Sequence, residues 1–219
     1  MCSAVWSVKG GAGSSVVAVA LASMWSASSP FGSLLVDGDG DIPAMVGSSE
    51  PSGPGITEWL AADSDVPIAA LDRIQLPLSE NISLLPKGRR AFVDNQRNVE
   101  FVRYLQQQSA SVVADLGVVD QHSTFALDVL SSASRSVLVL RSCFVSLRRA
   151  LALNLSPTDI VLIEEPQRAL CRGDVEDVLG QKLSAVIPFD PAIARCVDAG
   201  LLLAKLPEPL RKTVSHVVR

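Results

Sequence analysis

The fold is decided by the segment Ser3-Ala4-Val5-Trp6-Ser7-Val8-Lys9-Gly10-Gly11-Ala12-Gly13-Ser14-Ser15. An apolar strand, predicted over Ser3–Val8, runs into a glycine-rich turn, and an apolar helix is predicted directly after it over Ser14–Ala27. Glycines at such a turn let backbone N–H groups approach a phosphate, which then lies at the positive end of the helix. The segment therefore predicts a strand–loop–helix unit that can hold a phosphate group.

The loop departs from the ordinary phosphate loop, G-x-x-x-x-G-K-[ST], at the lysine position. Gly13 is followed by Ser14, and Ser15 then supplies the hydroxyl that reaches a metal ion in that pattern. Two other interpretations of the loop stay open at this point. The first is a tight turn that holds no ligand, because glycine turns are common after strands in α/β folds.

The second is a dinucleotide site. Gly11-Ala12-Gly13 forms a G-x-G pattern, and Asp37 ends the next predicted strand about where a ribose-binding acid belongs. Val16 stands at the third glycine position of that motif, which weakens this interpretation.

Strand and helix patterns alternate along the chain. Nearly continuous apolar runs predict further strands over Ser33–Asp37, Asn81–Leu85, Ser111–Asp115, Ser136–Leu140, Asp159–Ile163 and Lys182–Ile187. Helices are predicted over Asp94–Gln108, Ser123–Ser132, Phe144–Leu153, Gly173–Gly180 and Pro191–Ala199, with a closing helix over Pro207–Arg219. Apolar runs of this kind suit strands buried on both faces of a parallel sheet. The pattern predicts one α/β domain over residues 1–219, a doubly wound, mostly parallel sheet with helices on both faces.

Two details of this pattern are open to a structural check. In the helix Asp94–Gln108, the apolar residues Val99, Val102 and Leu105 are expected on one side. The segment Gly47–Gly55, rich in Ser, Gly and Pro, is expected to form an exposed loop.

Composition argues against several classes of protein. The 219 residues are 48% hydrophobic and 19% charged, which excludes a disordered chain. A net charge of −4 and an aromatic content of 5% argue against nucleic-acid binding. The longest apolar run, Val16–Ala22, is too short for a membrane span. The cysteines are scattered, as expected for reduced thiols of a cytoplasmic protein.

Acidic residues end two of the predicted strands. The strand Ser33–Asp37 leads into Gly38-Asp39-Gly40-Asp41, and the strand Ser111–Asp115 itself ends in an aspartate. The carboxyl ends of strands are where α/β proteins bind ligands. An aspartate at the end of a buried strand is also typical of the Walker B acid, which holds Mg²⁺ beside phosphates. The alternative for both is a polar turn after a strand.

Together, these motifs resemble those of the deviant Walker ATPases of the ParA and MinD family. The members of that family read K-G-G-x-G-K-[ST], then V-D-x-D after the second strand, then a strand that ends in aspartate. Many also carry a stretch like Ile187–Arg195, with Ala199-Gly200 after it. The resemblance covers most of the chain, and the subgroup it favours is the CpaE/TadZ-like pilus-assembly proteins and the related septum-site proteins.

The resemblance implies a site for ATP and Mg²⁺. Lys9 matches the signature lysine, which in the family reaches across a sandwich dimer to the partner's phosphates. Asp39 matches the acid that positions the attacking water, and Ser15 and Asp115 match the Mg²⁺ residues. The expected nucleotide contacts are Lys9, Gly10, Gly11, Ala12, Gly13, Ser14, Ser15 and Pro188.

Two departures from the family pattern weaken the expected nucleotide site. Ser14 stands at the position that normally contacts the β and γ phosphates, and Ile163-Glu164-Glu165 stands where an adenine-reading asparagine is usual. A charge-assisted hydrogen bond contributes about 1.5–3 kcal/mol, so its loss weakens ATP binding roughly 10- to 100-fold. We therefore expect weak ATP binding, with hydrolysis that is slow or absent.

The function implied by the resemblance is the nucleotide-sensitive positioning of a pilus or secretion apparatus or of the septum. The protein is then a cytoplasmic homodimer that binds protein partners, which recruit it to a pole or to the inner membrane face. Two alternatives remain. One is a pseudo-ATPase adaptor that dimerises without nucleotide turnover, and the other is a dinucleotide-dependent oxidoreductase.

The histidines, an arginine pair and the C-terminal tail are not expected to carry the function. His122 is predicted to be a loop residue and His216 a surface residue of the closing helix. Arg148-Arg149 is predicted to be a solvated helix face, with contact to DNA phosphates as the alternative. The amphipathic tail Leu210–Arg219 is predicted to pack on the core rather than to bind a membrane, because it is short and lacks Phe and Trp.

Overall fold

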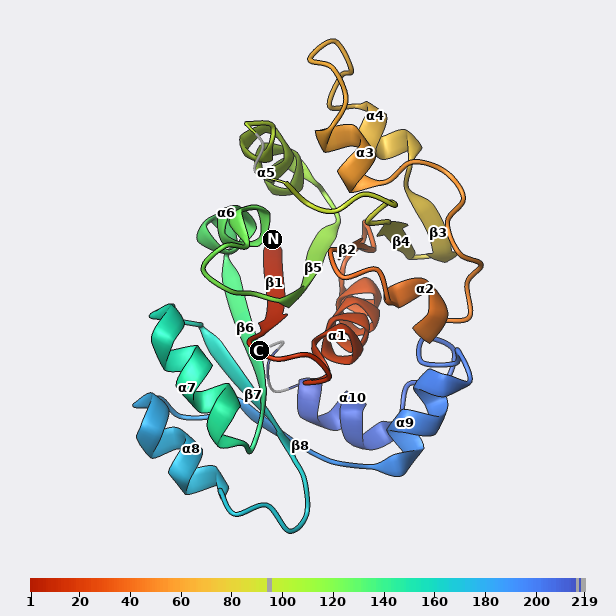
Figure 1. Cartoon of the computed structure of the whole chain (residues 1–219). Helices are drawn as coiled ribbons and strands as arrows, with labels where there is room; N and C mark the ends of the chain where they lie inside the picture. Colours follow the sequence, from red (N-terminus) through yellow and green to blue (C-terminus); the bar gives the residue numbers. More distant parts are fainter. Residues whose placement is uncertain (94–95, 216, 218–219) are drawn as a thin grey trace.

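The computed structural model describes residues 1–93, 96–215 and 217, and its centre is an eight-stranded sheet (Figure 1). The strands lie in the order β3-β4-β2-β5-β1-β6-β7-β8; β3 runs antiparallel to β4, and the other pairings are parallel. Their bounds are β1 Cys2–Ser7, β2 Ser33–Asp37, β3 Leu76–Ser79, β4 Ile82–Leu85, β5 Ser111–Val118, β6 Arg135–Arg141, β7 Asp159–Glu164 and β8 Ala185–Pro188. The predicted fold class is confirmed.

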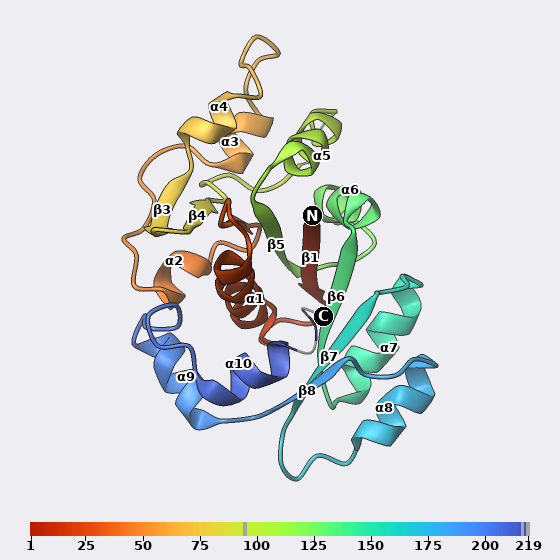
Figure 2. The same cartoon turned by 180° about the vertical axis from the view of Figure 1, so that it is seen from behind.

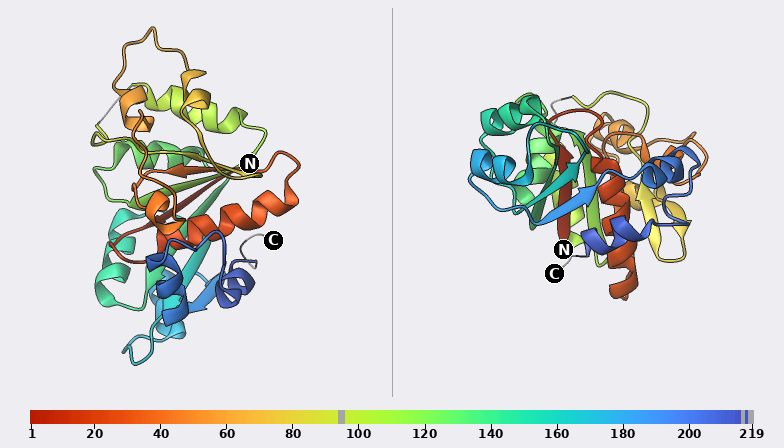
Figure 3. Two further views of the ribbon diagram at one scale, coloured as in Figure 1. Left: turned by 90° about the vertical axis from the view of Figure 1, so that its right-hand side faces the viewer. Right: turned by 90° about the horizontal axis from the view of Figure 1, so that it is seen from below.

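Helices cover both faces of this sheet, as the edge-on views show (Figure 3). One face carries α3 Ile56–Leu60, α4 Ala70–Arg73, α5 Asn98–Gln107, α6 Thr124–Ser132, α7 Phe144–Leu153 and α8 Arg172–Leu179. The other carries α1 Ser14–Ser28, α2 Ile42–Met45, α9 Pro191–Asp198 and α10 Glu208–Val214, which lie together in both Figure 1 and Figure 2.

Alternation along the central strands builds both halves of the core. In β1, Ala4 and Trp6 belong to one apolar cluster and Val5 to the other. The same alternation occurs in β6, where Leu138 and Val139 face opposite clusters. Successive side chains of a strand point to opposite faces, so a strand covered by helices on both sides is apolar throughout.

Element boundaries agree with the sequence-based prediction where the apolar runs are long. The strand Ser33–Asp37 and the helix Phe144–Leu153 have the predicted bounds. The short helices α2, α3 and α4 and the strand β3 were not predicted. β3 is an edge strand that contains Pro77, a residue that cannot donate to a sheet and argues against a strand in sequence reasoning. The segment Gly47–Gly55 contains neither helix nor strand.

The predicted apolar side of α5 is wrong at Val99, whose exposed fraction is 56%. The buried side instead contains Phe101, Tyr104 and Leu105. Phe101 lies between aromatic partners, with ring centroids 6.4 Å from Trp59 and 5.2 Å from Phe125. Burial of these large rings sets the rotation of the helix. The predicted start of this helix at Asp94 lies outside the described residues.

The closing helix packs on the core, as predicted. Leu210, Val214 and Val217 are buried against the α1 side of the sheet. His216, Val218 and Arg219 lie outside the described residues. Within the described part of the chain, no helix combines the length and apolar character needed to cross a bilayer.

The topology brings several loops to one edge of the sheet. β1 lies between β5 and β6; on one side the strands continue in chain order to β8, and on the other they follow as β5, β2, β4 and β3. The carboxyl ends of these parallel strands therefore meet beside the loop that follows β1. Such a switch point is where open α/β sheets form their binding crevice.

Candidate functional site

The loop between β1 and α1 presents unpaired backbone N–H groups. Gly11 and Gly13 adopt φ values of +72° and +98°, which favour glycine. Within the described part of the chain, none of the backbone N–H groups of residues 10–13 donates a hydrogen bond. The first-turn N–H groups of α1 add to them, because a helix start leaves them without intrahelical partners. The loop therefore forms a cradle for an anion.

Two side chains hold this loop, Ser7 at the end of β1 and Arg149 of α7. The Ser7 hydroxyl lies 3.2 Å from the carbonyl oxygens of both Gly117 and Lys9, so it can donate to either. Arg149 of α7 donates from Nη1 to the carbonyl oxygen of Val8 at 3.2 Å. Arg148 and Arg149 are both exposed, as predicted, yet Arg149 also braces the entry to the loop.

Asp115 does not end its strand as predicted, because β5 continues to Val118; it lies opposite Val5 of β1 and is completely buried. Its Oδ1 accepts a hydrogen bond from the Gly117 N–H at 3.2 Å, whereas its buried Oδ2 has no hydrogen-bond partner among the described residues. Burial raises the pKa of Asp115 to about 7, against the opposing effect of the polar groups of Ser15 and Gly117. An orphaned carboxylate oxygen beside a serine fits Mg²⁺, which prefers oxygen ligands.

Asp37 has a structural role in the acid-rich turn. It is buried, and its Oδ1 accepts a hydrogen bond from the Gly40 N–H at 2.6 Å. Burial raises the pKa of Asp37 to about 6, with the Gly40 N–H opposing this and the neighbouring Asp39 and Asp41 adding to it. The carboxylate closes the turn on itself, and this bond occupies an oxygen that a ribose-binding acid would offer to the ribose hydroxyls.

Asp39 presents its side chain over Gly117. A Cβ at Gly117, which has a φ of +60°, would lie only 2.6 Å from the Asp39 carboxyl carbon, so the close approach requires glycine. Desolvation of this carboxyl and the charge of Asp41 raise the pKa of Asp39, and Lys87 opposes them. Lys87 donates to the Asp39 carbonyl oxygen at 2.9 Å, which ties the turn to the loop after β4.

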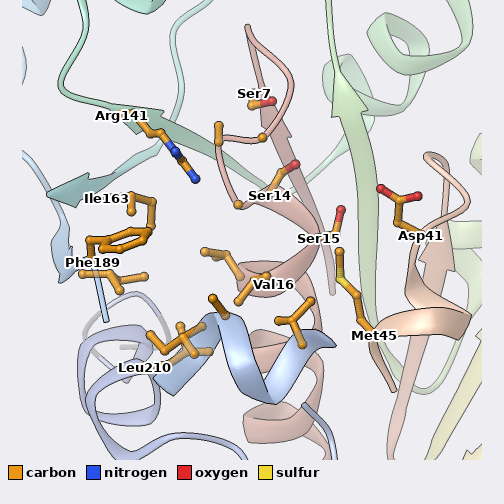
Figure 4. A pocket seen from close by; sticks show the side chains of 18 of the residues that line it. Ser7, Ser14, Ser15, Val16, Asp41, Met45, Arg141, Ile163, Phe189 and Leu210 are labelled. Atoms are coloured by element: carbon orange, nitrogen blue, oxygen red, sulfur yellow. The ribbon is translucent and has the colours of Figure 1, made fainter. Parts of the chain in front are cut away.

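A cavity of about 300 Å³ opens beside the loop (Figure 4). It brings together these residues that the sequence pointed to: Gly10, Gly11, Ala12, Gly13, Ser14, Ser15, Asp39 and Pro188. Ile163, Phe189 and Ile193 form its apolar end, and Ile163 lies next to the loop, because a Cβ at Gly13 would meet Ile163 Cγ1 at 3.8 Å. This volume lies at the lower end of the range typical of small-molecule sites.

Two predicted site residues do not line the cavity. Lys9 is exposed to solvent, and Asp115 is completely buried. Sequence reasoning missed Arg141, which extends from the end of β6 toward the loop (Figure 4). The available signal was a charged residue directly after the apolar run of the strand predicted over Ser136–Leu140.

Comparison with solved structures finds the same fold in other proteins. The ParA family ATPase from Chlorobium tepidum superposes with a TM-score of 0.76 at 22% identity, over 97% of this chain and 95% of its own. The septum site-determining protein MinD of Pyrococcus horikoshii, solved with Mg-ADP, has a TM-score of 0.76 at 21% identity, over 99% and 93% of the two chains. The chain has the ParA/MinD fold.

Other proteins with the ParA/MinD fold match over similar lengths. A McdA variant of Cyanothece in complex with ATP has a TM-score of 0.69 at 17% identity, over 100% of this chain and 95% of its own. Comparisons with models of protein families and with curated sequences find no match. At such low identities the likeness establishes the ParA/MinD fold, and the role of each site residue rests on the geometry described above.

Proposed function

We propose that the chain binds ATP with Mg²⁺ at the loop between β1 and α1. The observation that carries this proposal is the pairing of two unsatisfied groups, one in the loop that leads to Ser15 and one on Asp115 beside Ser15. The N–H groups of residues 10–13 need an acceptor, and the buried Oδ2 of Asp115 needs a cation or a donor. A phosphate with its magnesium ion satisfies both.

Each site residue has a proposed task. The backbone of residues 10–15 binds the phosphates, and Ser15 and Asp115 hold Mg²⁺ directly or through water. Mg²⁺ would neutralise charge on the phosphate oxygens when bound. Asp39, held over Gly117, orients a water molecule toward the phosphate end of the cavity. Pro188 lines the apolar end, where the base is expected to lie.

Hydrolysis is proposed to be slow or absent. Ser14 lines the cavity where a phosphate loop ordinarily has lysine. The loop therefore lacks a positive charge whose interaction with the phosphates becomes stronger as the transition state forms. Lys9 is exposed, so its ammonium can act across an interface.

The cellular role that we propose is spatial positioning by a nucleotide-sensitive homodimer. Support comes from the proteins that share the fold, among them a septum site-determining MinD and a MinC:MinD cell division complex of Aquifex aeolicus. We propose that this chain binds protein partners of a pilus, secretion or division apparatus. It would act in the cytoplasm and be recruited by those partners to a pole or to the inner membrane face.

The alternatives have less structural support. A pseudo-ATPase adaptor that works without nucleotide is favoured by Ser14 but leaves the unsatisfied cradle unexplained. A dinucleotide-dependent oxidoreductase needs Asp37 at a ribose, and that carboxylate is buried and bonded within its own turn.

Nucleotide titration by calorimetry separates these possibilities. We expect ATP and ADP to bind in the presence of Mg²⁺ and to bind more weakly in EDTA, and we expect no binding of NADH or NADPH. Binding of NADH in preference to ATP would establish the dinucleotide alternative. If no nucleotide binds, the pseudo-ATPase adaptor is the alternative that remains.

A further inference from the structure

Arg141 is a cation that points into the cavity from outside the phosphate loop. It ends β6, directly beside Ile163 in the β7 register, and its guanidinium extends toward the loop that carries Ser14 (Figure 4). The exposed fraction of its side chain is 34%, so the guanidinium is reachable from the cavity.

One edge of the guanidinium is held by Glu165. Arg141 donates from Nη1 to Glu165 Oε1 at 2.6 Å. The other oxygen of the same carboxylate is bonded to Arg168. Two guanidinium groups therefore share one carboxylate, so the cluster keeps a net positive charge beside the cavity.

The other edge of the guanidinium is unpaired. The Nε of Arg141 is buried without a hydrogen-bond partner among the described residues, and Nη2 donates to none of them. A buried N–H without an acceptor is costly, and such groups are rare in folded proteins. An acceptor from outside the chain can reach this edge at Nη2, which is not buried as Nε is.

We propose that Arg141 provides, from β6, the positive charge that the loop lacks at Ser14, and that its free edge binds the phosphates of the nucleotide. This inference rests on the proposed nucleotide site. The planar fork of arginine matches phosphate oxygens, and its charge does not depend on pH in the physiological range. Glu165 is then a positioning residue, because it fixes the opposite edge of the fork.

The position of Arg141 decides between it and Lys9 as the source of this charge. Arg141 lines the cavity, whereas Lys9 is exposed and does not line it. Among the described residues of one molecule, Arg141 is therefore the cation that lines the cavity beside the phosphate cradle.

The test compares the affinities of full-length variants for Mg·ATP and for adenosine. We expect Arg141→Gln to weaken Mg·ATP binding roughly 10- to 100-fold, the loss expected for one charge-assisted bond, and to leave adenosine binding unchanged. The Mg·ATP affinity of Arg141→Lys is expected to lie between those of the wild type and Arg141→Gln. The matched control is Arg135→Gln, which removes the same charge from the other end of β6, where Arg135 pairs with Asp159 at 3.0 Å.

A double variant tests whether a lysine in the loop can replace the charge of Arg141. Adding Ser14→Lys to Arg141→Gln should restore most of the lost Mg·ATP affinity, because the loop then carries its own charge. Circular dichroism and thermal unfolding check that each variant is folded.

Two results would overturn the inference and can be told apart. If the wild type and Arg141→Gln bind Mg·ATP with equal affinity, the role of Arg141 is rejected and the proposed nucleotide site is retained. Failure of the wild type to bind Mg·ATP would reject the proposed function, and the role of Arg141 with it.

Discussion

Ser14 places a short hydroxyl at the start of α1, where it is buried at the edge of the phosphate cradle. Serine cannot extend a charge to a phosphate oxygen as lysine does. The unpaired N–H groups around it are backbone atoms, so they survive this change of side chain. The residue therefore alters how strongly a phosphate is held and how fast it reacts, and leaves the shape of the loop intact.

Replacing Ser14 by lysine is expected to raise the rate of phosphate release from ATP by roughly 10-fold or more, since an added charge at the phosphates stabilises the transition state. The native chain should show little turnover in the same assay. Ser28→Lys, the same substitution at the far end of α1, is the control and should leave the rate unchanged. Native turnover as fast as that of Ser14→Lys would show that the loop needs no lysine.

Asp115 is expected to account for the magnesium dependence of nucleotide binding. In Asp115→Asn we expect roughly 10- to 100-fold weaker Mg·ATP binding, because one charged ligand of the ion is lost. Binding in EDTA should be similar in the variant and the wild type. Without ligand, the variant should be at least as stable as the wild type, because it no longer buries a carboxylate whose pKa is raised by desolvation.

Calorimetry with and without Mg²⁺ gives the comparison for Asp115. The control is Asp177→Asn, at an exposed position of α8 far along the chain. Equal affinities with and without Mg²⁺ in the wild type would mean that no metal is held there.

At the scale of elements, the contacts that join helices to strands were the part least accessible to sequence reasoning. α8 is tied to the segment that leads into β8 through Glu176, which accepts from Lys182 Nζ at 2.7 Å and from the Leu183 N–H at 3.1 Å. Arg172 Nε, one turn earlier in the helix, donates to it at 3.1 Å. A glutamate in a helical pattern gives no sign of three such partners.

Stability is expected to depend on pH through Glu176. The Lys182 ammonium, followed by the Leu183 N–H, lowers the pKa of Glu176 from its ordinary value of 4.5 to about 2. A lowered pKa means that the folded state prefers the charged form. This contribution is therefore complete above pH 4.5 and is lost as the pH falls from 4.5 through 2.

Glu176→Gln should be less stable than the wild type at pH 7, and the difference should shrink toward zero near pH 2. Urea unfolding at a series of pH values measures it. Asp177→Asn, on the exposed side of the same helix, should show no such pH-dependent difference. If the difference in the free energy of unfolding is the same at every pH, the effect of the substitution comes from packing and not from the charge.

At the scale of the whole molecule, the exposed start of the loop leaves room for a second copy of the chain. A Cβ added at Gly10 or at Gly11 would meet nothing within 4 Å, and Lys9 is exposed next to them. A face-to-face dimer would place two such loops opposite each other, where each Lys9 reaches the phosphates bound by its partner.

We expect Mg·ATP to shift the chain from monomer to dimer, and we expect Lys9→Ala to abolish this shift while it remains folded. Sedimentation velocity with and without nucleotide measures the change. Lys205→Ala removes an exposed lysine elsewhere and should dimerise like the wild type. A native chain that stays monomeric in saturating ATP, or dimerises equally without it, would favour the adaptor.

The sequence by itself determined the α/β class, the central strands and the glycine loop. These depend on local patterns: apolar runs that suit strands buried on both faces, and glycines where φ is positive, as at Gly11 and Gly13. The edge strand β3 and the rotation of α5 could not be found this way. Pro77 contradicts the strand pattern, and Phe101 faces the core because rings distant in sequence surround it.

Only the tertiary structure decided how the acids and cations divide their tasks. Asp37, Asp39 and Asp115 look alike in the sequence as acids at strand ends, yet one closes its own turn, one lies over a glycine and one keeps an unpaired oxygen. Arg141 joins the cavity because β6 ends beside the loop that follows β1. The surroundings of each charged side chain depend on segments that are far apart in the chain. The strength of an electrostatic interaction depends on position and burial, which the sequence alone does not give.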